Sequence, residues 1–580
     1  MGARVERVGP GARVETAVAA IDGGWVSHLE QALTLEVALY LAAIVLAAAL
    51  RLLFLDLRPL SVEEGALALD AHLLSQGRPI EALQQGPFVV FGTALAMFTF
   101  GGGDAAARLL PALFGTALVA TPYLLRDALG RVPALLAAYA MAVSPLLVFA
   151  SRDVGGGMVP LALGLLLWCA LDQGLKDAGR ARAYAAAALA GALLASGTEG
   201  ATLLVTLALA ALISHPQPAR LVAGLRDASS SPVWRRAALV FVASALALGT
   251  GLGTRPSGVQ SVAVDVWANW LGSFSLSARR GNLVVLLALY ELPVLVFGLA
   301  QLFRTMFRRH RTDMFLSLWS VLLLLSCMMQ ETSSPSRVVL PVLPLYLLFA
   351  RLASDSLGLA RWVGRGWGWT TASTAVAVPA AVAIILLNRA SSGADIPTPF
   401  LYGEGALLIA GAIAVAFLLN GREKVALAWC AAAILSVGFL IHATAFLNYR
   451  LETLPSEPIV GSQVSTSLRD ASLDAAYFAA YYNAPVTVDP ELRSATRWYL
   501  REARSVQYST EAPDGISIML VRGARPEMGK GFERRPALYT PGVDVRAFSW
   551  RSAWGWLAMR DGLVRANQRD IIVRAPAGNW

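Results

Sequence analysis

Long runs of apolar residues, separated by short polar stretches, dominate the first 450 residues of the chain. A run of about twenty apolar residues is long enough to cross a hydrocarbon core of ~30 Å as an α-helix. Such runs lie near residues 33–55, 107–125, 131–150, 157–175, 183–197, 200–214, 236–253, 283–303, 313–330, 337–353, 371–388, 402–420 and 424–446. The pattern therefore predicts a polytopic α-helical membrane protein, with about thirteen transmembrane helices in residues 33–450.

The basic loops between these runs predict the orientation. Lysine and arginine gather on the cytoplasmic side of membrane proteins, and the basic loops lie at 126–131, 176–182, 220–236, 304–311, 361–365 and 422–424. A shorter apolar run, 88–100, decides whether these loops share one side. If it crossed the membrane, loops 126–131 and 176–182 would face outward. We therefore expect a juxtamembrane helix on the outer surface at 88–100, a cytoplasmic segment 1–32 and an outer loop 56–106.

A glutamate interrupts the apolar pattern between the runs 183–197 and 200–214. The linker, residues 196–200, fits two short helices that meet at an outward-facing Glu199. The alternative is one long tilted helix, which would leave the carboxylate in lipid. Because a charge in lipid is costly, two helices are the favoured prediction.

The composition changes after residue 450. Residues 451–580 are mixed and charged, with strand-like segments at 485–488 and 516–521 and a helix-like segment at 491–503. This alternation predicts a small extracytoplasmic α/β domain. Three tryptophans fit either an aromatic belt at the membrane interface or the core of this domain. They are Trp550, Trp554 and Trp556.

Composition and charge exclude several functions. Of the 580 residues, 56% are hydrophobic and 15% are charged, whereas about a quarter are charged in soluble proteins. The net charge of +9 lies in loops, where it sets orientation, so it does not indicate nucleic-acid binding. The three cysteines fall in apolar runs and only five histidines are present. We therefore expect neither a disulfide framework nor a His-rich metal site.

Arginines and carboxylates gather at the predicted outer ends of the helices. An arginine can hold a lipid phosphate through paired, charge-assisted hydrogen bonds, and a carboxylate can act as general base on a hydroxyl. The candidates are Arg58, Glu63, Glu64, Arg152, Asp153, Glu199, Arg255, Glu331 and Arg337. These acids could also hold a divalent metal ion, although no spacing demands one. No Gly-rich nucleotide motif accompanies them, which agrees with a donor that carries its own phosphate.

Each candidate also has a purely structural interpretation. Glu63 and Glu64 are then solvated loop charges, arginines at helix ends anchor the topology, and Glu331 caps the segment that follows it. Asp104 and Arg108 are expected to position the juxtamembrane helix rather than to bind substrate.

Six stretches carry a family resemblance. They are Arg58–Ala71, Ala107–Gly115, Ser144-Pro145 through Ser151-Arg152, Thr254–Gly258, Leu289-Tyr290-Glu291 and Trp498-Tyr499-Leu500-Arg501. In order and spacing they resemble the GT-C class of polyprenyl-phosphate-dependent glycosyltransferases, which includes protein O-mannosyltransferases and the lipid A aminoarabinose transferase. Within that class they resemble a prokaryotic branch, the flippase-activity-associated membrane proteins of archaeal-type N-glycosylation clusters. The resemblance implies a GT-C fold, a prokaryotic cell membrane and a polyprenyl-phosphate sugar as donor.

Carried over to this chain, the resemblance assigns roles to the two consecutive glutamates. The family's loop after the first span carries Asp-Glu, and its first acid is the base. Glu63 would then be the catalytic base, and Glu64 would bind substrate or a metal ion. Neighbours on a helix point about 100° apart, so we expect the two residues to have different roles.

The chain departs from the family pattern at three polar positions. Gly155, Gly156 and Gly157 replace polar residues, Gln85-Gly86-Pro87 stands for His-Gly-Pro, and Glu331-Thr332 stands for Glu-Lys. A fold retained without its full chemistry would show this pattern. Two functions therefore remain open: an active transferase, and an accessory or scaffold member of the fold that binds a lipid-linked glycan or other membrane proteins. A transporter is disfavoured, because no internal hydropathy repeat is present.

The hypothesis carried forward is an inverting glycosyltransferase on the outer membrane face. Arg255 and Arg337 would hold the donor phosphate, with Arg58 supporting the loop. Asp153 or Glu199 would orient the sugar or the acceptor, which is a protein or a glycan. The outer domain, through its Trp498-Tyr499 motif, would either select the acceptor or serve as a docking module. Membrane lipids are expected partners, and membership of a larger membrane complex is compatible with the sequence.

Overall fold

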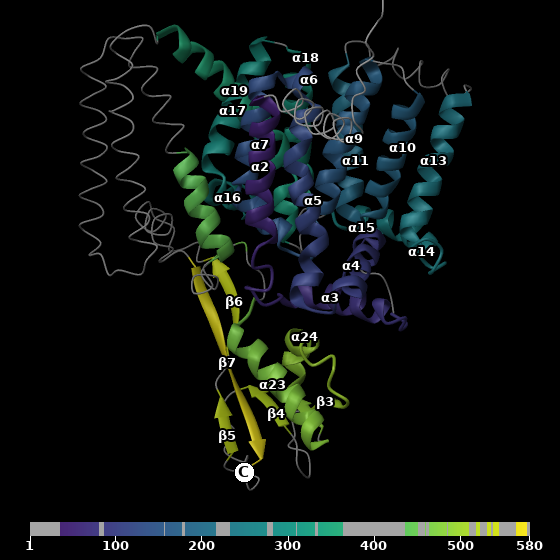
Figure 1. Cartoon of the computed structure of the whole chain (residues 1–580), viewed down its shortest axis with the longest axis vertical. Coiled ribbons are helices and arrows are strands. Elements are labelled where there is room, and N and C mark those ends of the chain that lie inside the picture. Colours follow the sequence, from purple (N-terminus) through teal and green to yellow (C-terminus); the bar gives the residue numbers. More distant parts are fainter. Residues whose placement is uncertain are drawn as a thin grey trace, which may run out of the picture.

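The structure is a computed structural model of the chain. It describes residues 35–80, 86–155, 157–176, 180–215, 232–274, 282–308, 310–330, 335–363, 436–449, 457, 459, 463–483, 485–509, 518–522, 531–534, 537–543 and 564–576. A bundle of helices is followed by a mixed segment of strands and helices that lies at one end of the bundle (Figure 1). We call residues 463–576 the C-terminal segment, and the end of the bundle that carries it the α3 face.

The helices of the bundle follow the apolar runs. They are α2 (Leu35–Leu52), α3 (Val62–Ser75), α4 (Pro87–Phe100), α5 (Asp104–Leu124), α6 (Arg126–Leu129), α7 (Arg131–Ala142), α8 (Pro145–Ser151), α9 (Met158–Lys176), α10 (Arg180–Ala195), α11 (Thr198–Ser214), α13 (Pro232–Gly249), α14 (Gly258–Gln260), α15 (Val266–Gly272), α16 (Asn282–Tyr290), α17 (Leu292–Arg308), α18 (Arg311–Met329) and α19 (Val342–Val363). Residues 436–449 are helical as well. The predicted division at Glu199 is confirmed, because α10 and α11 are separate helices.

The number of membrane spans stays a prediction. Among the described residues, five helices are long and apolar enough to cross a membrane, or six if the bent pair α7 and α8 is one span. The predicted runs 371–388 and 402–420, the segment 1–32 and the three C-terminal tryptophans lie outside the described residues. A helix, α4, forms where the juxtamembrane helix is predicted. α6, which lies in the predicted basic loop 126–131, is at the end of the bundle opposite the α3 face (Figure 1).

Two runs that the sequence predicts as single helices are broken. The run 131–150 divides into α7 and α8, which are bent by 61°, and Pro145 opens the second helix. The run 283–303 divides into α16 and α17, and Pro293 lies in the first turn of the second. Ser144, before Pro145, is extended, as expected for the residue before a proline. Pro293 lies in the first turn of α17, where its missing N–H leaves no helical hydrogen bond unmade.

A buried carboxyl group holds these two breaks together. Glu291, between α16 and α17, is 1% exposed. Its Oε1 accepts the Ser144 hydroxyl at 2.6 Å and the Leu146 N–H at 3.2 Å, and its Oε2 accepts the Tyr346 hydroxyl at 2.5 Å. The contact fixes the start of α8, whose other end leads to Arg152 and the residues of the candidate site.

The C-terminal segment joins strands and helices. Its elements are β1 (Gln463–Val464), α23 (Thr466–Tyr482), β2 (Val486–Val488), α24 (Arg493–Thr496), β3 (Val506–Tyr508), β4 (Ile518–Arg522), β5 (Gly531–Arg534), β6 (Ala537–Val543) and β7 (Val564–Pro576). In the described part the strand order is β1-β6-β7-β4-β2-β3, with β5 also on β7. β2 pairs in parallel with β3 and β4, and Val486 is opposite Val506 and Ile518.

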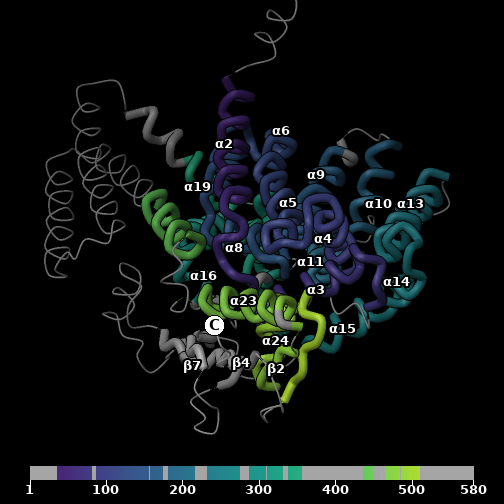
Figure 2. The backbone as a smooth tube through the Cα atoms, turned by 60° about the horizontal axis from the view of Figure 1, so that its bottom comes forward, coloured from purple at the N-terminus to yellow at the C-terminus, as the bar shows by residue number. Residues whose placement is uncertain are grey.

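The predicted secondary structure of this segment is partly right. β2 and β4 lie where strands are predicted. The continuous helix predicted for 491–503 is wrong: α24 has four residues, and turns follow it to residue 502. The residues after α24 bind the α3 face instead, and such tertiary contacts override local helix propensity. α24 lies beside α3 (Figure 2).

Candidate functional site

The loop between α2 and α3, residues 53–61, is held by arginines from other elements. Arg152, which follows α8, donates to the carbonyl groups of Leu53 at 2.7 Å and of Phe54. Phe54 has a φ of +55°, a backbone conformation that a non-glycine residue keeps only where its surroundings fix it. The terminal nitrogens of Arg152 are thus occupied by the loop, although the sequence marked this arginine as a substrate ligand.

Arg108 on α5 binds the same loop and α3 together. Its Nη1 donates to the Leu55 carbonyl at 2.9 Å and its Nη2 to the Pro59 carbonyl at 3.2 Å. Its Nε and Nη2 also donate to the two carboxylate oxygens of Glu64, at 2.9 and 2.8 Å. Such a two-point contact is strong and directional. Arg108 is therefore structural, as expected, but it holds loop 53–61 and α3.

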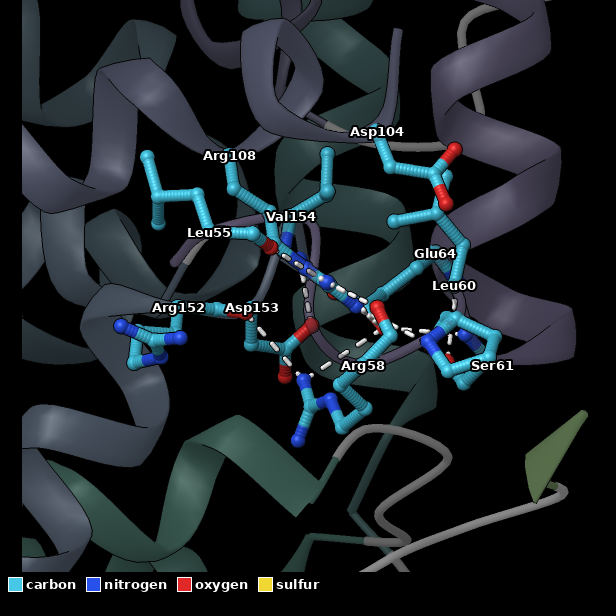
Figure 3. Close-up of polar contacts among 12 residues, drawn as sticks. Leu55, Arg58, Leu60, Ser61, Glu64, Asp104, Arg108, Arg152, Asp153 and Val154 are labelled. Atoms are coloured by element: carbon cyan, nitrogen blue, oxygen red, sulfur yellow. Dashed lines mark hydrogen bonds and ion pairs between the residues drawn. The ribbon is translucent and has the colours of Figure 1, made fainter. Parts of the chain in front are cut away.

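Glu64 is buried, with 1% exposed, and hydrogen-bonded at both oxygens. Oε1 accepts the Val154 N–H at 3.2 Å, and Oε2 accepts the Ser61 N–H at 2.9 Å and Arg58 Nη2 at 3.5 Å (Figure 3). The Ser61 hydroxyl in turn accepts the Glu64 N–H, which completes a capping box at the start of α3. Burial alone would raise the pKa of Glu64, but the charges of Arg108 and Arg58 outweigh burial and lower this pKa to about 2.

Glu63, its neighbour in the first turn of α3, is exposed. Because neighbouring residues on a helix diverge by about 100°, Glu63 and Glu64 leave α3 in different directions. The structure thus separates the two predicted catalytic acids: Glu64 is used to build the loop, and Glu63 is accessible to a substrate.

Asp153 is a second buried carboxyl group, with 7% exposed. Its Oδ1 accepts the Gly155 N–H at 2.9 Å. Among the described residues, no donor reaches Oδ2. Burial raises the pKa of Asp153 to about 7, the charge of Glu64 adds to the rise, and the charge of Arg58 opposes it. Asp153 therefore titrates near neutral pH and keeps an oxygen for a further partner.

The glycines after Asp153 contribute to its surroundings. A Cβ atom at Gly155 would lie 3.2 Å from Oδ1 and 3.3 Å from Oδ2 of Asp153, closer than most side chains approach one another. Glycine therefore leaves space beside the carboxyl group while its N–H still donates. From the sequence, the three glycines were interpreted as a loss of polar side chains. The structure adds that the Gly155 N–H donates a hydrogen bond to Asp153.

Two other candidates bind each other. Arg337, on the short helical turn Pro335–Val339, donates to the Glu199 carboxylate at 2.8 Å and to the Thr198 hydroxyl at 2.9 Å. Each charge of the pair is therefore compensated by the other at the start of α11, which the sequence did not predict. Glu331 lies outside the described residues.

Arg255 lies at the far end of α3 from Glu63. Its two Nη atoms donate to the Ile80 and Arg78 carbonyl groups, both at 3.4 Å. The Arg78 N–H bonds to the Leu73 carbonyl at 2.9 Å, which places Arg78 beside the last turn of α3. At 1.5 Å per residue, Leu73 is roughly 15 Å along the helix from Glu63. The structure thus does not bring Arg255 and Glu63 together.

Sequence reasoning missed how the C-terminal segment joins this site. Tyr499 Oη accepts the Leu60 N–H at 2.7 Å and donates to Asp104 Oδ2 at 3.4 Å. Trp498 Nε1 donates to Asp104 Oδ1 at 2.8 Å. These contacts favour the docking role of the Trp498-Tyr499 motif. No local signal could reveal them, because Leu60 and Tyr499 are 439 residues apart.

Comparison with solved structures gives the fold a name. ArnT from Cupriavidus metallidurans bound to undecaprenyl phosphate aligns with a TM-score of 0.54 and 16% identity, covering 93% of this chain and 98% of that one. Its apo state aligns with a TM-score of 0.52 and 17% identity, covering 95% and 98%. The chain has the GT-C fold of ArnT. No protein-family model matches the sequence, and no curated protein matches it significantly.

The GT-C fold confirms the predicted class of polytopic helical membrane protein. Because the match covers more than nine tenths of the chain, it takes in the bundle and at least part of the C-terminal segment. Within the described residues, no group of three or more His, Cys, Asp or Glu side chains is placed to hold a metal ion.

Proposed function

We propose that the chain is a membrane glycosyltransferase, which moves a sugar from a polyprenyl-phosphate donor to an acceptor at the α3 face. The observation that carries this proposal is a set of ionisable groups around loop 53–61 that the loop itself does not use. They are the Glu63 carboxylate, Oδ2 of Asp153 and Nη1 of Arg58. The GT-C fold supports the same substrate class, since ArnT with this fold is bound to undecaprenyl phosphate.

Arg58 is our first candidate for the donor phosphate. Its Nη2 donates to Glu64 and to the Arg152 carbonyl at 3.2 Å, and its other terminal nitrogen points away from Glu64 (Figure 3). Arg58, Arg108 and Arg152 bring three positive charges to the cluster, against Glu64 and a partly protonated Asp153. The surplus positive charge, in a site shielded from water, favours a phosphate.

Glu63 would act as the base. The acceptor hydroxyl oxygen forms a bond to the anomeric carbon of the sugar as the bond from that carbon to the phosphate oxygen breaks. The hydroxyl proton passes to the Glu63 carboxylate, and polyprenyl phosphate leaves with the bonding electrons. One displacement of this kind inverts the anomeric centre. Asp153 would orient the sugar through Oδ2, because Glu199 is engaged by Arg337.

The test measures transfer from labelled polyprenyl-phosphate sugars by purified protein in lipid nanodiscs. We expect Glu63→Gln to lose turnover by at least about 100-fold, as expected for removal of a general base, while it still retains undecaprenyl phosphate. Glu502→Gln, which changes a side chain that is 75% exposed, is the matched control and should transfer normally. Normal turnover in Glu63→Gln would contradict the assignment of the base.

The glycine run favours a second candidate function. Gly155 and Gly157 offer no side chain where the resembling family has polar residues, which fits an accessory protein that binds a lipid-linked glycan without transferring it. Wild-type protein that retains undecaprenyl phosphate but shows no transfer from any donor of the panel would support this alternative and contradict the transferase.

A further inference from the structure

Tyr499 links the C-terminal segment to the loop that carries the proposed site. The side chain is buried, with 3% exposed. Its hydroxyl group is used twice, as acceptor for the Leu60 N–H and as donor to Asp104. Leu60 directly precedes Ser61, the N-cap of α3, and is itself 1% exposed. A backbone N–H buried this deeply needs a partner, and Tyr499 is the one it has.

The contacts divide between two faces of the same loop. Arg108 binds its carbonyl groups from the bundle, whereas the C-terminal segment binds it from the other side. In addition to Tyr499, Arg469 on α23 donates to the Asp56 carbonyl at 3.3 Å. Asp104, one helical turn before Arg108 on α5, binds the C-terminal segment through Trp498 and Tyr499. α5 therefore aligns both parts of the chain on the loop.

The C-terminal segment packs closely against α3, so a displacement of this segment would move α3 as well. Trp498 is 1% exposed, and a Cβ atom at Gly65 of α3 would lie only 3.3 Å from the Trp498 Cβ. Arg501 stacks over the Trp498 ring at 3.9 Å and donates to the Gly102 carbonyl at 2.7 Å. Trp498 and Arg501 thus fix the segment against the starts of α3 and α5, independently of the Tyr499 hydroxyl.

We propose that Tyr499 is a positioning residue for the reaction: it fixes the Leu60–Ser61 backbone and thereby the place of Glu63. Its role in the reaction rests on the transferase function proposed above. The C-terminal segment would then be part of the catalytic apparatus rather than an appended module. A base that is misplaced by ~1 Å can lose about 100-fold in rate, so one hydrogen bond two residues before α3 has a measurable consequence.

The experiment uses the full-length variant Tyr499→Phe, which keeps the ring and removes the hydroxyl group. Tyr477→Phe is the matched control, since Tyr477 is 68% exposed on α23. Hydrogen exchange is measured in peptides that cover loop 53–61 and the start of α3. We expect exchange there to be roughly fivefold to tenfold faster in Tyr499→Phe, as expected for one lost hydrogen bond. Exchange in α5 and α23, and all exchange in the control, should be unchanged.

Kinetics give the second readout. Tyr499→Phe should lower kcat by roughly tenfold to 100-fold and leave KM for the lipid donor unchanged, because Glu63 follows the Leu60–Ser61 backbone, whereas Arg58 is held separately by Glu64 and the Arg152 carbonyl. Unchanged exchange in loop 53–61 would overturn the positioning role, whether or not the protein transfers sugar. Faster exchange with a normal kcat would also overturn it. If wild type transfers no sugar but hydrogen exchange is faster in the variant, the transferase function is contradicted, whereas the role of Tyr499 in fixing the loop is supported.

Discussion

Glu64 and Asp153 are two buried carboxyl groups at the same face, and their pKa values shift in opposite directions. Glu64 receives donors from Arg108, Ser61, Val154 and Arg58, and its pKa falls to about 2 despite burial. Asp153 receives the Gly155 N–H, and burial raises its pKa to about 7. Burial is similar in both, so the neighbouring charges decide the direction: Arg108 and Arg58 lower the pKa of Glu64, whereas the charge of Glu64 adds to the rise at Asp153.

The difference separates a structural carboxylate, Glu64, from a carboxyl group that is open to substrate, Asp153. A carboxylate whose lone pairs are all used holds the loop and has little left for a substrate. A carboxyl group with a free oxygen and a pKa near neutrality can exchange a proton or accept a sugar hydroxyl. The variants below test this division, from the largest expected effect to the smallest.

Removing the main partner of Glu64 should have the largest effect. Arg108→Ala leaves a buried carboxylate without its two-point partner and loop 53–61 without its donor. We expect a loss of about 3–5 kcal/mol in the free energy of unfolding, measured by denaturation in detergent. Arg131→Ala is the control, because the Arg131 side chain is 78% exposed and 3.9 Å from Glu36, and it should change stability little. Equal stability of both variants would contradict the structural role of the Glu64 cluster.

Asp153 should matter for turnover and its pH dependence. Asp153→Asn removes the charge but keeps the shape, and we expect turnover to fall by about 100-fold with normal stability, because the sugar loses the group that orients it. In wild type, turnover should rise as the pH increases through about 7, because the carboxyl group loses its proton there. The variant should lack this step. A retained step near pH 7 in Asp153→Asn, compared with the exposed control Asp127→Asn, would mean that another group titrates.

Arg255 should have the smallest effect, limited to donor binding. Its hydrogen bonds to loop carbonyls leave its charge available to a lipid phosphate that enters near the end of α3. Because it lies roughly 15 Å along α3 from Glu63, Arg255→Ala should raise KM for the lipid donor roughly fivefold to tenfold and leave kcat unchanged. Arg236→Ala, at the other end of α13, is the control. A fall in kcat would show that Arg255 acts at the reacting centre.

Much of the fold follows from the sequence because hydrophobic length and loop charge act locally. The runs that became α2, α5, α9 and α18 are readable in this way, as is the division at Glu199. The breaks beside Pro145 and Pro293 were not predicted, because proline alone does not decide a break: α5 continues through Pro111 and Pro122. Their pairing through Glu291 was not predicted either, because it joins residues 147 positions apart.

The candidate site could be predicted only in its residue types. Arg58, Glu63, Glu64 and Asp153 do gather at one face, but which glutamate is exposed depends on how α3 docks. The docking of α3 depends on Arg108, which the sequence analysis expected to position the juxtamembrane helix. It also depends on Tyr499, which lies in the C-terminal segment. Arg337 and Glu199 show the same limit, since each was a candidate ligand and the structure pairs them.

The most direct test of the transferase is a single-turnover reaction of wild type and Glu63→Gln with a labelled polyprenyl-phosphate sugar in the same nanodiscs. The measurement follows two products together, the labelled acceptor and the released polyprenyl phosphate. We predict that wild type forms both in equal amounts, and that Glu63→Gln retains the donor and forms neither. Retention of the donor by both proteins, with no product from either, would contradict the proposed function.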